Sequence, residues 1–303
     1  MTAFHPHDQL IDDPNHHQIE RIRRLQTRAE RERTGLYYIE GMRFVARAMN
    51  HSVPIVALVA CPPLLTHPFA RHLVRRQQRA GTPILTVTPE VISGLGSVED
   101  PQGIGAVVRQ HWTPLERIRP AGAPCWVMLE TMRSSGNLGT ILRTAEATGG
   151  SGLILLGDTI DPYDPATVRA TMGSQFRQQF VRTSIHELRD WHVRRHFSLV
   201  GTAPAAATDY QEADFRGPTV LLLGDERKGL SQELQALCDG VVRIPMVGTD
   251  SLNVSIAAGV LLYEVFNQRR RVRVAARGAG RQGRYPARAT VRGGGVDRRP
   301  GRW

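Results

Sequence analysis

The sequence predicts an α/β fold in two parts: a small α/β domain followed by a larger domain built on a mostly parallel sheet. Three observations predict it. Short apolar runs of strand length alternate with helical segments, which is typical of parallel sheets covered by helices on both faces. The chain has 303 residues, enough for two domains that each bury a core. A stretch rich in proline and charge at 113–124 separates the two alternating regions and indicates a linker.

The first alternating region spans 18–112 and follows a segment, 1–17, that we expect to be mobile. Apolar residues on one stripe predict a charged helix at 18–33. The other elements expected here are strands at 35–41, 54–60 and 83–87 and helices at 42–50 and within 63–79. This βαβα alternation predicts a small α/β domain.

The second alternating region spans 125–271. Its expected elements are strands at 125–129, 152–156, 198–202 and 219–223 and helices at 138–148 and 252–268. The tail at 272–303 is rich in Arg and Gly with few apolar residues, so it cannot bury a core and is predicted to be disordered. Two interpretations are open: an arm that binds RNA without sequence specificity, or a solvated extension without a role. The second interpretation is favoured.

The net charge of +11 is confined to the end of the chain. The twelve arginines and single acid that follow Gln268 account for all of it, which leaves 27 basic and 27 acidic side chains elsewhere. A contact between RNA and the folded part must therefore come from a local basic patch, which the sequence alone does not locate.

The cysteines and the hydropathy point to a cytoplasmic protein. Cys61, Cys125 and Cys238 are widely spaced and form no Cys-x-x-Cys pair, which argues against a disulfide framework or a zinc site. Four histidines near the amino terminus give no convincing metal site. No apolar run is long enough for a transmembrane helix, and the first residues lack the profile of a secretory signal. We therefore expect no metal and no membrane partner.

Glycines mark the first two candidate motifs. In the segment 136–146, Gly136 and Gly139 bracket Asn137 near an expected helix start. Asn137 is thus either a helix cap or a site residue, and Arg143 either a surface ion-pair partner or a site residue. The segment 223–231 is a glycine-bounded loop after a strand. It is not a phosphate-binding Walker A loop, since Leu230 stands where that motif requires Lys.

The third motif, 244–259, combines a turn with a helix start rich in small residues. Gly259 costs about 1 kcal/mol of helix propensity relative to Ala, so we expect close packing against another backbone or a ligand to compensate for it. A plain amphipathic helix would not need such small residues.

Together, and in this order, the segments 136–146, 223–231 and 244–259 resemble the three motifs of the SpoU/TrmH family of SPOUT RNA 2′-O-ribose methyltransferases. The resemblance implies that 125–271 is a SPOUT domain with a deep trefoil knot, which general rules of chain connection would not predict. It also implies S-adenosylmethionine as the cofactor, RNA as the substrate and a homodimer. The segments 161–165 and 169–173 resemble a further family segment.

The resemblance also assigns residues. The catalytic positions are Arg143, Asn137, Glu226, Ser251 and Asn253. The positions expected to contact the cofactor are Gly224, Ile244, Leu252, Leu223, Met246 and Asn253. The segment 40–45 resembles a substrate-binding domain similar to ribosomal proteins that bind kinked RNA, so 18–112 is expected to bind RNA through Glu40 and Arg43, with Arg143 as a further RNA contact.

One segment departs from the family pattern. Many relatives carry Asp-Gly-x-x-Asp-Pro where this chain has Glu-Thr-Met-Arg-Ser-Ser at 130–135, so the loop shape and the choice of substrate are expected to differ. Ribosomal RNA is the favoured substrate and transfer RNA the alternative. A protein of the same fold that binds RNA without catalysis is the alternative from a different class.

The implied reaction moves a methyl group from a sulfonium to a ribose 2′-hydroxyl. Family accounts make the position of Arg143 the general base, but a guanidinium almost never loses its proton in a protein. We therefore expect Arg143 to bind the 3′-phosphate or the developing alkoxide while water or phosphate accepts the proton. Asn137 would orient Arg143 or the ribose.

Overall fold

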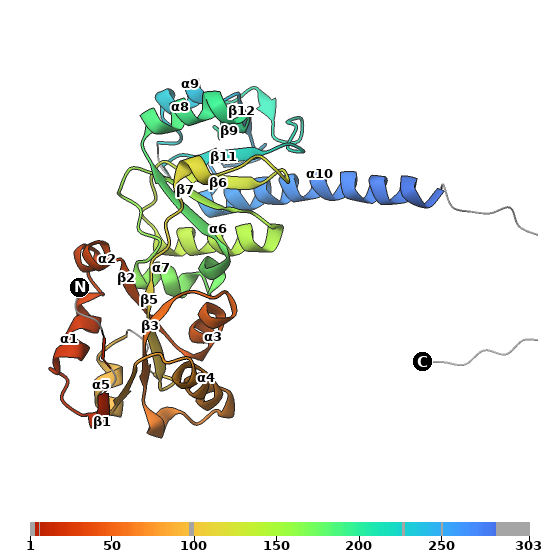
Figure 1. Ribbon diagram of the computed structural model, residues 1–303. Helices are drawn as coiled ribbons and strands as arrows, with labels where there is room; N and C mark the ends of the chain where they lie inside the picture. Colours follow the sequence, from red (N-terminus) through yellow and green to blue (C-terminus); the bar gives the residue numbers. More distant parts are fainter. Residues whose placement is uncertain (1–3, 6, 97–99, 226–227, 250, 283–303) are drawn as a thin grey trace, which may run out of the picture.

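The computed structural model describes residues 4–5, 7–96, 100–225, 228–249 and 251–282, with only the backbone for 7–8 and 273–282. Two sheets with helices on both faces follow one another along the chain (Figure 1). No helix in the described ranges is both long and apolar enough to cross a membrane. The predicted fold class, a mostly parallel sheet preceded by a smaller α/β domain, is confirmed.

The first sheet has the strand order β1-β4-β3-β5-β2 and is mixed, because β5 runs antiparallel to β2 and β3. Its strands are β1 (His7–Ile11), β2 (Leu36–Glu40), β3 (Ile55–Ala60), β4 (Ile84–Val87) and β5 (Ile104–Arg109). The helices around it are α1 (His17–Arg24), α2 (Arg28–Thr34), α3 (Met42–Asn50), α4 (Pro68–Arg79) and α5 (Pro89–Ser93). Helices α3 and α4 cover one face, and α1 and α5 cover the other (Figure 1).

Two features of this domain differ from the prediction. The single helix expected at 18–33 is two helices, α1 and α2, because Thr27 has extended backbone and its hydroxyl accepts a hydrogen bond from Glu30 N as the cap of α2. The prediction of a mobile segment at 1–17 does not anticipate β1, which pairs with β4. Phe4 and Ile11 from this segment are buried in the core.

The second sheet has the order β10-β12-β9-β11-β6-β7-β8, and neighbouring strands run parallel. Its strands are β6 (Cys125–Leu129), β7 (Gly152–Leu156), β8 (Gln179–Thr183), β9 (Ser198–Thr202), β10 (Thr208–Asp209), β11 (Thr219–Leu223) and β12 (Gly240–Arg243). The helices are α6 (Ser135–Thr148), α7 (Pro165–Ala170), α8 (Ile185–Arg195), α9 (Gln232–Leu237) and α10 (Val254–Gln282). Buried side chains place α6, α7 and α10 on one face and α8 and α9 on the other.

The last helix differs from the prediction at both ends. It begins at Val254 rather than at 252, and it continues to Gln282, into the tail that was expected to be disordered. The rest of that tail, 283–303, lies outside the described residues. Within the described residues the chain does not pack closely at Gly259, since an added Cβ would meet only Thr144 Cγ2, at 3.9 Å, and the alternative of a close ligand stays a prediction. The tight approach is at Gly139, where a Cβ would lie 2.4 Å from that of Ala170.

One of the hydrophobic cores contains residues of both domains and joins them. It contains α3 and α4 residues such as Val45 and Leu73 together with α6 and α10 residues such as Ile141 and Leu261. The segment predicted to be a linker, 113–124, packs against the second sheet, because Leu115 and Ile118 are buried in the core on its other face. The two domains are therefore held in one orientation.

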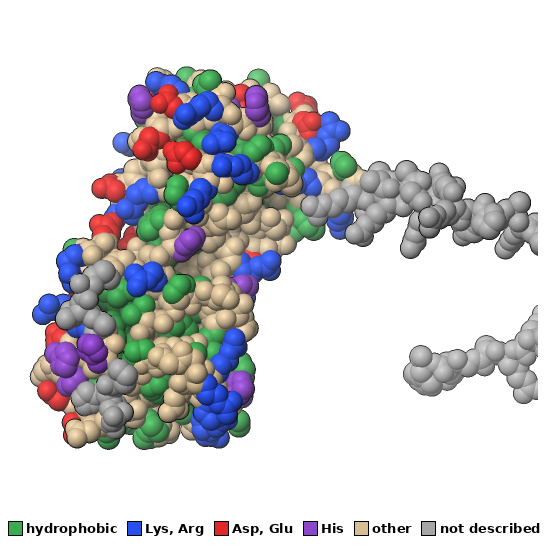
Figure 2. Space-filling model, viewed as in Figure 1, with side chains coloured by type: hydrophobic (Ala, Val, Ile, Leu, Met, Phe, Trp, Pro, Cys, Tyr) green, Lys and Arg blue, Asp and Glu red, His purple; other side chains and the backbone are tan. Residues whose placement is uncertain are grey.

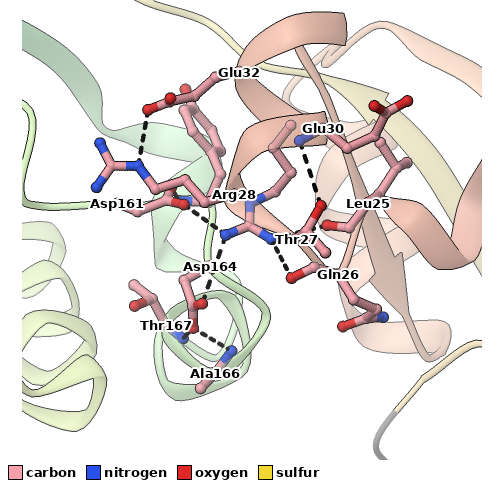
Figure 3. Close-up of polar contacts among 12 residues, drawn as sticks. Leu25, Gln26, Thr27, Arg28, Glu30, Glu32, Asp161, Asp164, Ala166 and Thr167 are labelled. Carbon is pink, nitrogen blue, oxygen red and sulfur yellow. Dashed lines mark hydrogen bonds and ion pairs between the residues drawn. The ribbon is translucent and has the colours of Figure 1, made fainter.

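A buried arginine adds polar contacts across this junction. Arg31 of α2 is 2% exposed and donates from Nη2 to Asp161 Oδ2 at 2.6 Å, with Asp164 Oδ2 at 3.6 Å. Its Nη1 donates to the carbonyl oxygens of Leu25 and Gln26 at 2.9 and 2.7 Å. Figure 3 shows Asp161 and Asp164 reaching from the second domain toward this turn. Arg31 thus donates hydrogen bonds to backbone carbonyls at the end of α1 and binds the segment before α7 through an ion pair.

Candidate functional site

A cavity of about 550 Å³ lies at the carboxyl ends of β9, β11 and β12, which are neighbours in the sheet. Ligands of parallel α/β sheets bind at this edge. Most of the residues predicted to contact the cofactor line it, namely Leu223, Gly224, Ile244, Met246 and Leu252. Ser251, which was predicted to be catalytic, lines it too. The second and third motifs therefore form the walls of one cavity.

The loop after β11 turns back tightly on itself at Gly224. Asp225 and Gly229 exchange two backbone hydrogen bonds of 3.0 and 2.9 Å. A Cβ at Gly224 would lie 2.1 Å from the Gly229 carbonyl carbon and from Leu230 N. Only glycine allows this approach, and the turn gives the cavity its backbone wall.

Replacing Gly224 with alanine is expected to open this turn and weaken cofactor binding. Overpacking of this kind costs about 1–3 kcal/mol, so we expect a loss of affinity of about tenfold or more. Isothermal titration calorimetry with S-adenosylmethionine measures the affinity of each variant. Gly240→Ala is the matched control, since nothing lies within 4 Å of a Cβ at Gly240. Equal affinity in the two variants would contradict the prediction.

The first motif meets the third through Asn137. Helix α6 is capped by Ser134, whose Oγ accepts from Asn137 N at 3.2 Å, so the capping interpretation of Asn137 is wrong. The Asn137 side chain instead accepts at Oδ1 from Asn253 Nδ2 at 3.2 Å and from Ser255 Oγ at 3.4 Å. Asn253 Oδ1 in turn accepts from Ser255 N at 2.9 Å, at the start of α10. These amides join the two helix starts beside the cavity.

Arg143 is exposed on α6, about 9 Å along the helix axis from Asn137. Its side chain makes no hydrogen bond or ion pair with any residue that the structure describes. The surface ion-pair interpretation is therefore not supported within the described residues. Glu226, also predicted to be catalytic, lies outside the described residues.

Sequence reasoning missed a second connection between the motifs. Thr131 Oγ1 donates to Asp225 Oδ2 at 3.1 Å, and Glu130 Oε2 accepts from Ser231 N at 2.9 Å. The loop after β6 thus holds both ends of the loop after β11. The signal was the departure from the family pattern at 130–135, which was interpreted as a change of loop shape and of substrate choice.

The two residues predicted to bind RNA in the first domain lie in different surroundings. Arg43 is exposed on α3. Glu40 is half-buried at the domain junction, in a small cavity lined also by Phe44, Pro165 and Arg169. Burial raises the pKa of Glu40 to about 7, against the opposing effect of Arg169. Glu40 therefore lies at the junction of the two domains, away from the open surface that carries Arg43.

The raised pKa of Glu40 gives a prediction for stability. Because this carboxyl is easier to ionise in the unfolded chain, its contribution to stability is full below the unfolded pKa of about 4.5 and is lost as the pH rises through about 7. Glu40→Gln is expected to remove that loss and stabilise the protein at pH 8 but not at pH 4. Thermal unfolding across this range measures it, with Glu90→Gln on α5 as the control. A pH profile shared by Glu40→Gln and wild type would contradict the prediction.

The described residues contain no cluster of three or more His, Cys, Asp or Glu side chains that could hold a metal ion. The three cysteines are free. The groups that line the cavity include backbone amides, the Ser251 hydroxyl, the Asp225 carboxylate and the Lys228 ammonium group.

The parallel sheet, the cavity at its carboxyl edge and the three motifs that meet there define a methyltransferase of the SPOUT class. Residues 124–263 match the family model described as SpoU rRNA Methylase family, and residues 16–106 match the MRM3-like substrate binding domain. The chain belongs to the SpoU rRNA methylase family. The predicted family is therefore confirmed.

Named relatives support this assignment over both domains. The chain is 36% identical over 253 residues to the 23S rRNA (uridine(2479)-2′-O)-methyltransferase of Streptomyces viridochromogenes, covering 81% of this chain and 87% of the relative. The AdoMet-bound rRNA methyltransferase from Sinorhizobium meliloti superposes with a TM-score of 0.79 at 34% identity, over 85% of this chain and 97% of that one. These findings confirm the predicted enzyme class and cofactor, and the shared SPOUT fold implies the predicted trefoil knot.

A relative that acts on transfer RNA matches a smaller part. The tRNA (guanosine(18)-2′-O)-methyltransferase of Thermus thermophilus is 37% identical over 148 residues, which is 47% of this chain and 74% of the relative. That match is shorter than the combined length of the two domains.

Proposed function

We propose that this protein transfers the methyl group of S-adenosylmethionine to a ribose 2′-hydroxyl of ribosomal RNA. The observation that carries the proposal is the meeting of all three motifs at one cavity: the second and third line it, and the first joins the third through the Asn137–Asn253 hydrogen bond. The position of the cavity at the carboxyl edge of a parallel sheet supports the same conclusion.

The cavity suits the cofactor in size and chemistry. Its apolar walls, from Leu223, Ile244, Met246 and Leu252, can enclose an adenine, and the backbone at Gly224 is open for hydrogen bonds to the ring edge. S-adenosylmethionine supplies a methyl carbon already activated by a positively charged sulfur. The protein therefore has to position the ribose and promote loss of the hydroxyl proton, and positioning alone can lower the activation barrier by about 7–11 kcal/mol.

Arg143 carries the electrostatic part of this chemistry. Its guanidinium binds the 3′-phosphate or the oxygen that becomes negative as the hydroxyl loses its proton, and water or phosphate accepts that proton. Asn137 and Asn253, fixed by their mutual hydrogen bond, orient the ribose at the cavity mouth. Ser251 holds the substrate edge of the cavity, and Glu226 is assigned to fix the loop after β11.

Ribosomal RNA is favoured over transfer RNA by the extent of the matches. The relative named for 23S rRNA aligns with both domains, whereas the relative named for tRNA aligns with less than half of the chain. We assign 18–112 to RNA binding, 113–124 to the linker and 125–271 to catalysis.

We also propose that the protein is a homodimer located in the cytoplasm. Ile256 and Tyr263 are 53% and 49% exposed and lie seven residues apart on α10, so they form one apolar stripe on its surface. A second copy would bury this stripe through a twofold contact. We infer the cytoplasmic location from the proposed methylation of ribosomal RNA.

The test is methyl transfer from tritiated S-adenosylmethionine to separated ribosomal and transfer RNA, with Arg143→Ala as the control. Label in ribosomal RNA that is lost in the variant supports the proposal. Label found only in transfer RNA would show that transfer RNA, and not ribosomal RNA, is the substrate. Absence of label and of cofactor binding would favour an RNA-binding protein without catalysis.

A further inference from the structure

The layer formed by α3 and α4 has an unusual charge. Between residues 41 and 89 the chain contains no Asp or Glu, but these two helices carry arginines throughout. The four arginines of α4 define what we call the α4 arginine face: Arg71, Arg75, Arg76 and Arg79. All four are exposed. Figure 2 shows blue side chains gathered over α4, at the lower right of the view, with no red among them.

Several arginines elsewhere in this domain are paired with carboxylates. On α2, Arg28 pairs with Glu32 and Arg33 with Glu30, within one turn of helix. On α4 no arginine forms an ion pair with a described residue, and Arg71 Nη1 donates a hydrogen bond to the Leu65 carbonyl oxygen at 2.7 Å. The side chains of Arg75, Arg76 and Arg79 form no ion pair or hydrogen bond with a described residue. Three guanidinium groups on this face are therefore available to a partner.

The spacing on α4 is regular. Arg71, Arg75 and Arg79 are four residues apart, so they form one stripe with a step of about 6 Å along the axis. Like charges at this spacing destabilise a helix. No acidic residue of the same helix offsets this row of positive charges. The phosphates of a nucleic acid provide a matching row of negative charges.

Helix α4 is linked to α6, which carries Arg143, through a shared core and through α3. The core that buries α4 also buries α6 and α10. Helix α3 lies between them, and its Arg47 forms an ion pair with Glu146 of α6, three residues beyond Arg143. A strand of RNA whose ribose reaches Arg143 can thus continue over α3 toward α4.

We propose that the α4 arginine face binds the phosphate backbone of the RNA that the enzyme methylates, on the flank of the target nucleotide. The inference rests on the proposed function and deepens it, since it names the surface of the first domain that holds the substrate. The contact is electrostatic and independent of sequence, so it supplies affinity, while base recognition comes from elsewhere.

The test compares two double variants of the full chain. Arg75→Gln with Arg79→Gln removes two charges from the face, and Arg24→Gln with Arg117→Gln removes two exposed arginines elsewhere. Binding to fluorescein-labelled poly(U) is measured across a salt series. Each lost phosphate contact lowers the slope of log K against log salt by about 0.7 for single strands, so the first variant should lose about 1.4. Its KM for ribosomal RNA should rise, with kcat and cofactor affinity unchanged.

Equal slopes and equal KM in the two double variants would overturn the inference while leaving the proposed function intact. If the wild type binds S-adenosylmethionine but neither binds nor methylates ribosomal RNA, the proposed function fails and the inference falls with it. An unchanged RNA slope combined with lost binding to phosphatidylserine vesicles would assign the face to a membrane and also overturn the inference.

Discussion

Replacing Arg143 with alanine is expected to reduce kcat by about 10²–10³-fold, the usual effect of removing one group that stabilises developing negative charge. The exposed guanidinium on α6 makes no ion pair or hydrogen bond with a described residue, so its loss should leave the fold and the cofactor cavity unchanged. Single-turnover methylation of ribosomal RNA and titration with S-adenosylmethionine separate the two effects.

Two further variants sharpen this test. Arg143→Lys keeps the charge but loses the planar two-point contact, so it should recover only a small part of the activity. Arg194→Ala removes an exposed arginine of α8, on the opposite face of the sheet, and should behave as wild type. Near-native turnover in the lysine variant would show that a point charge is sufficient and that the two-point contact is wrong.

Replacing Arg31 with alanine is expected to lower the free energy of unfolding by about 3–5 kcal/mol, because it leaves a partly buried carboxylate without its partner. Asp161 is 15% exposed and bonds Arg31 at 2.6 Å. The variant also leaves the carbonyl oxygens of Leu25 and Gln26 without the hydrogen bonds that Arg31 donates, which adds to the loss of stability. Denaturant unfolding measures the change.

The matched control is Arg33→Ala, on the same helix, whose guanidinium is 69% exposed in its pair with Glu30. Little change is expected there, since exposed pairs contribute little. In a double-mutant cycle, Arg31→Ala combined with Asp161→Asn should cost less than the sum of the single changes. Additive costs would mean that the two side chains do not stabilise one another.

The elements that the sequence predicted well are those whose local pattern agrees with their environment. Strands β6 and β11 are uninterrupted apolar runs, buried throughout, and their predicted bounds are those observed. Helix α3 was also predicted with its observed ends. Short strands such as β10 and β12 carry no such pattern, because their position depends on the strands beside them.

The site was predicted as a set of positions but not as an arrangement. The motifs named the residues that line the cavity, since each motif is local in sequence. The hydrogen bond between Asn137 and Asn253 and the ion pair between Arg31 and Asp161 join residues more than a hundred positions apart. Their formation depends on how the sheet and the domains pack. No spacing in the sequence encodes that packing.

The shared core across the two domains has a consequence for target choice. Because α3 and α6 are joined by that core and by the pair between Arg47 and Glu146, the fold fixes the distance between the α4 arginine face, which we propose binds RNA, and the cavity. Under that proposal, the methylated ribose lies at a set separation from the part of the RNA that α4 contacts. Lengthening the RNA between the two by one base pair should move the methylated nucleotide by the same step.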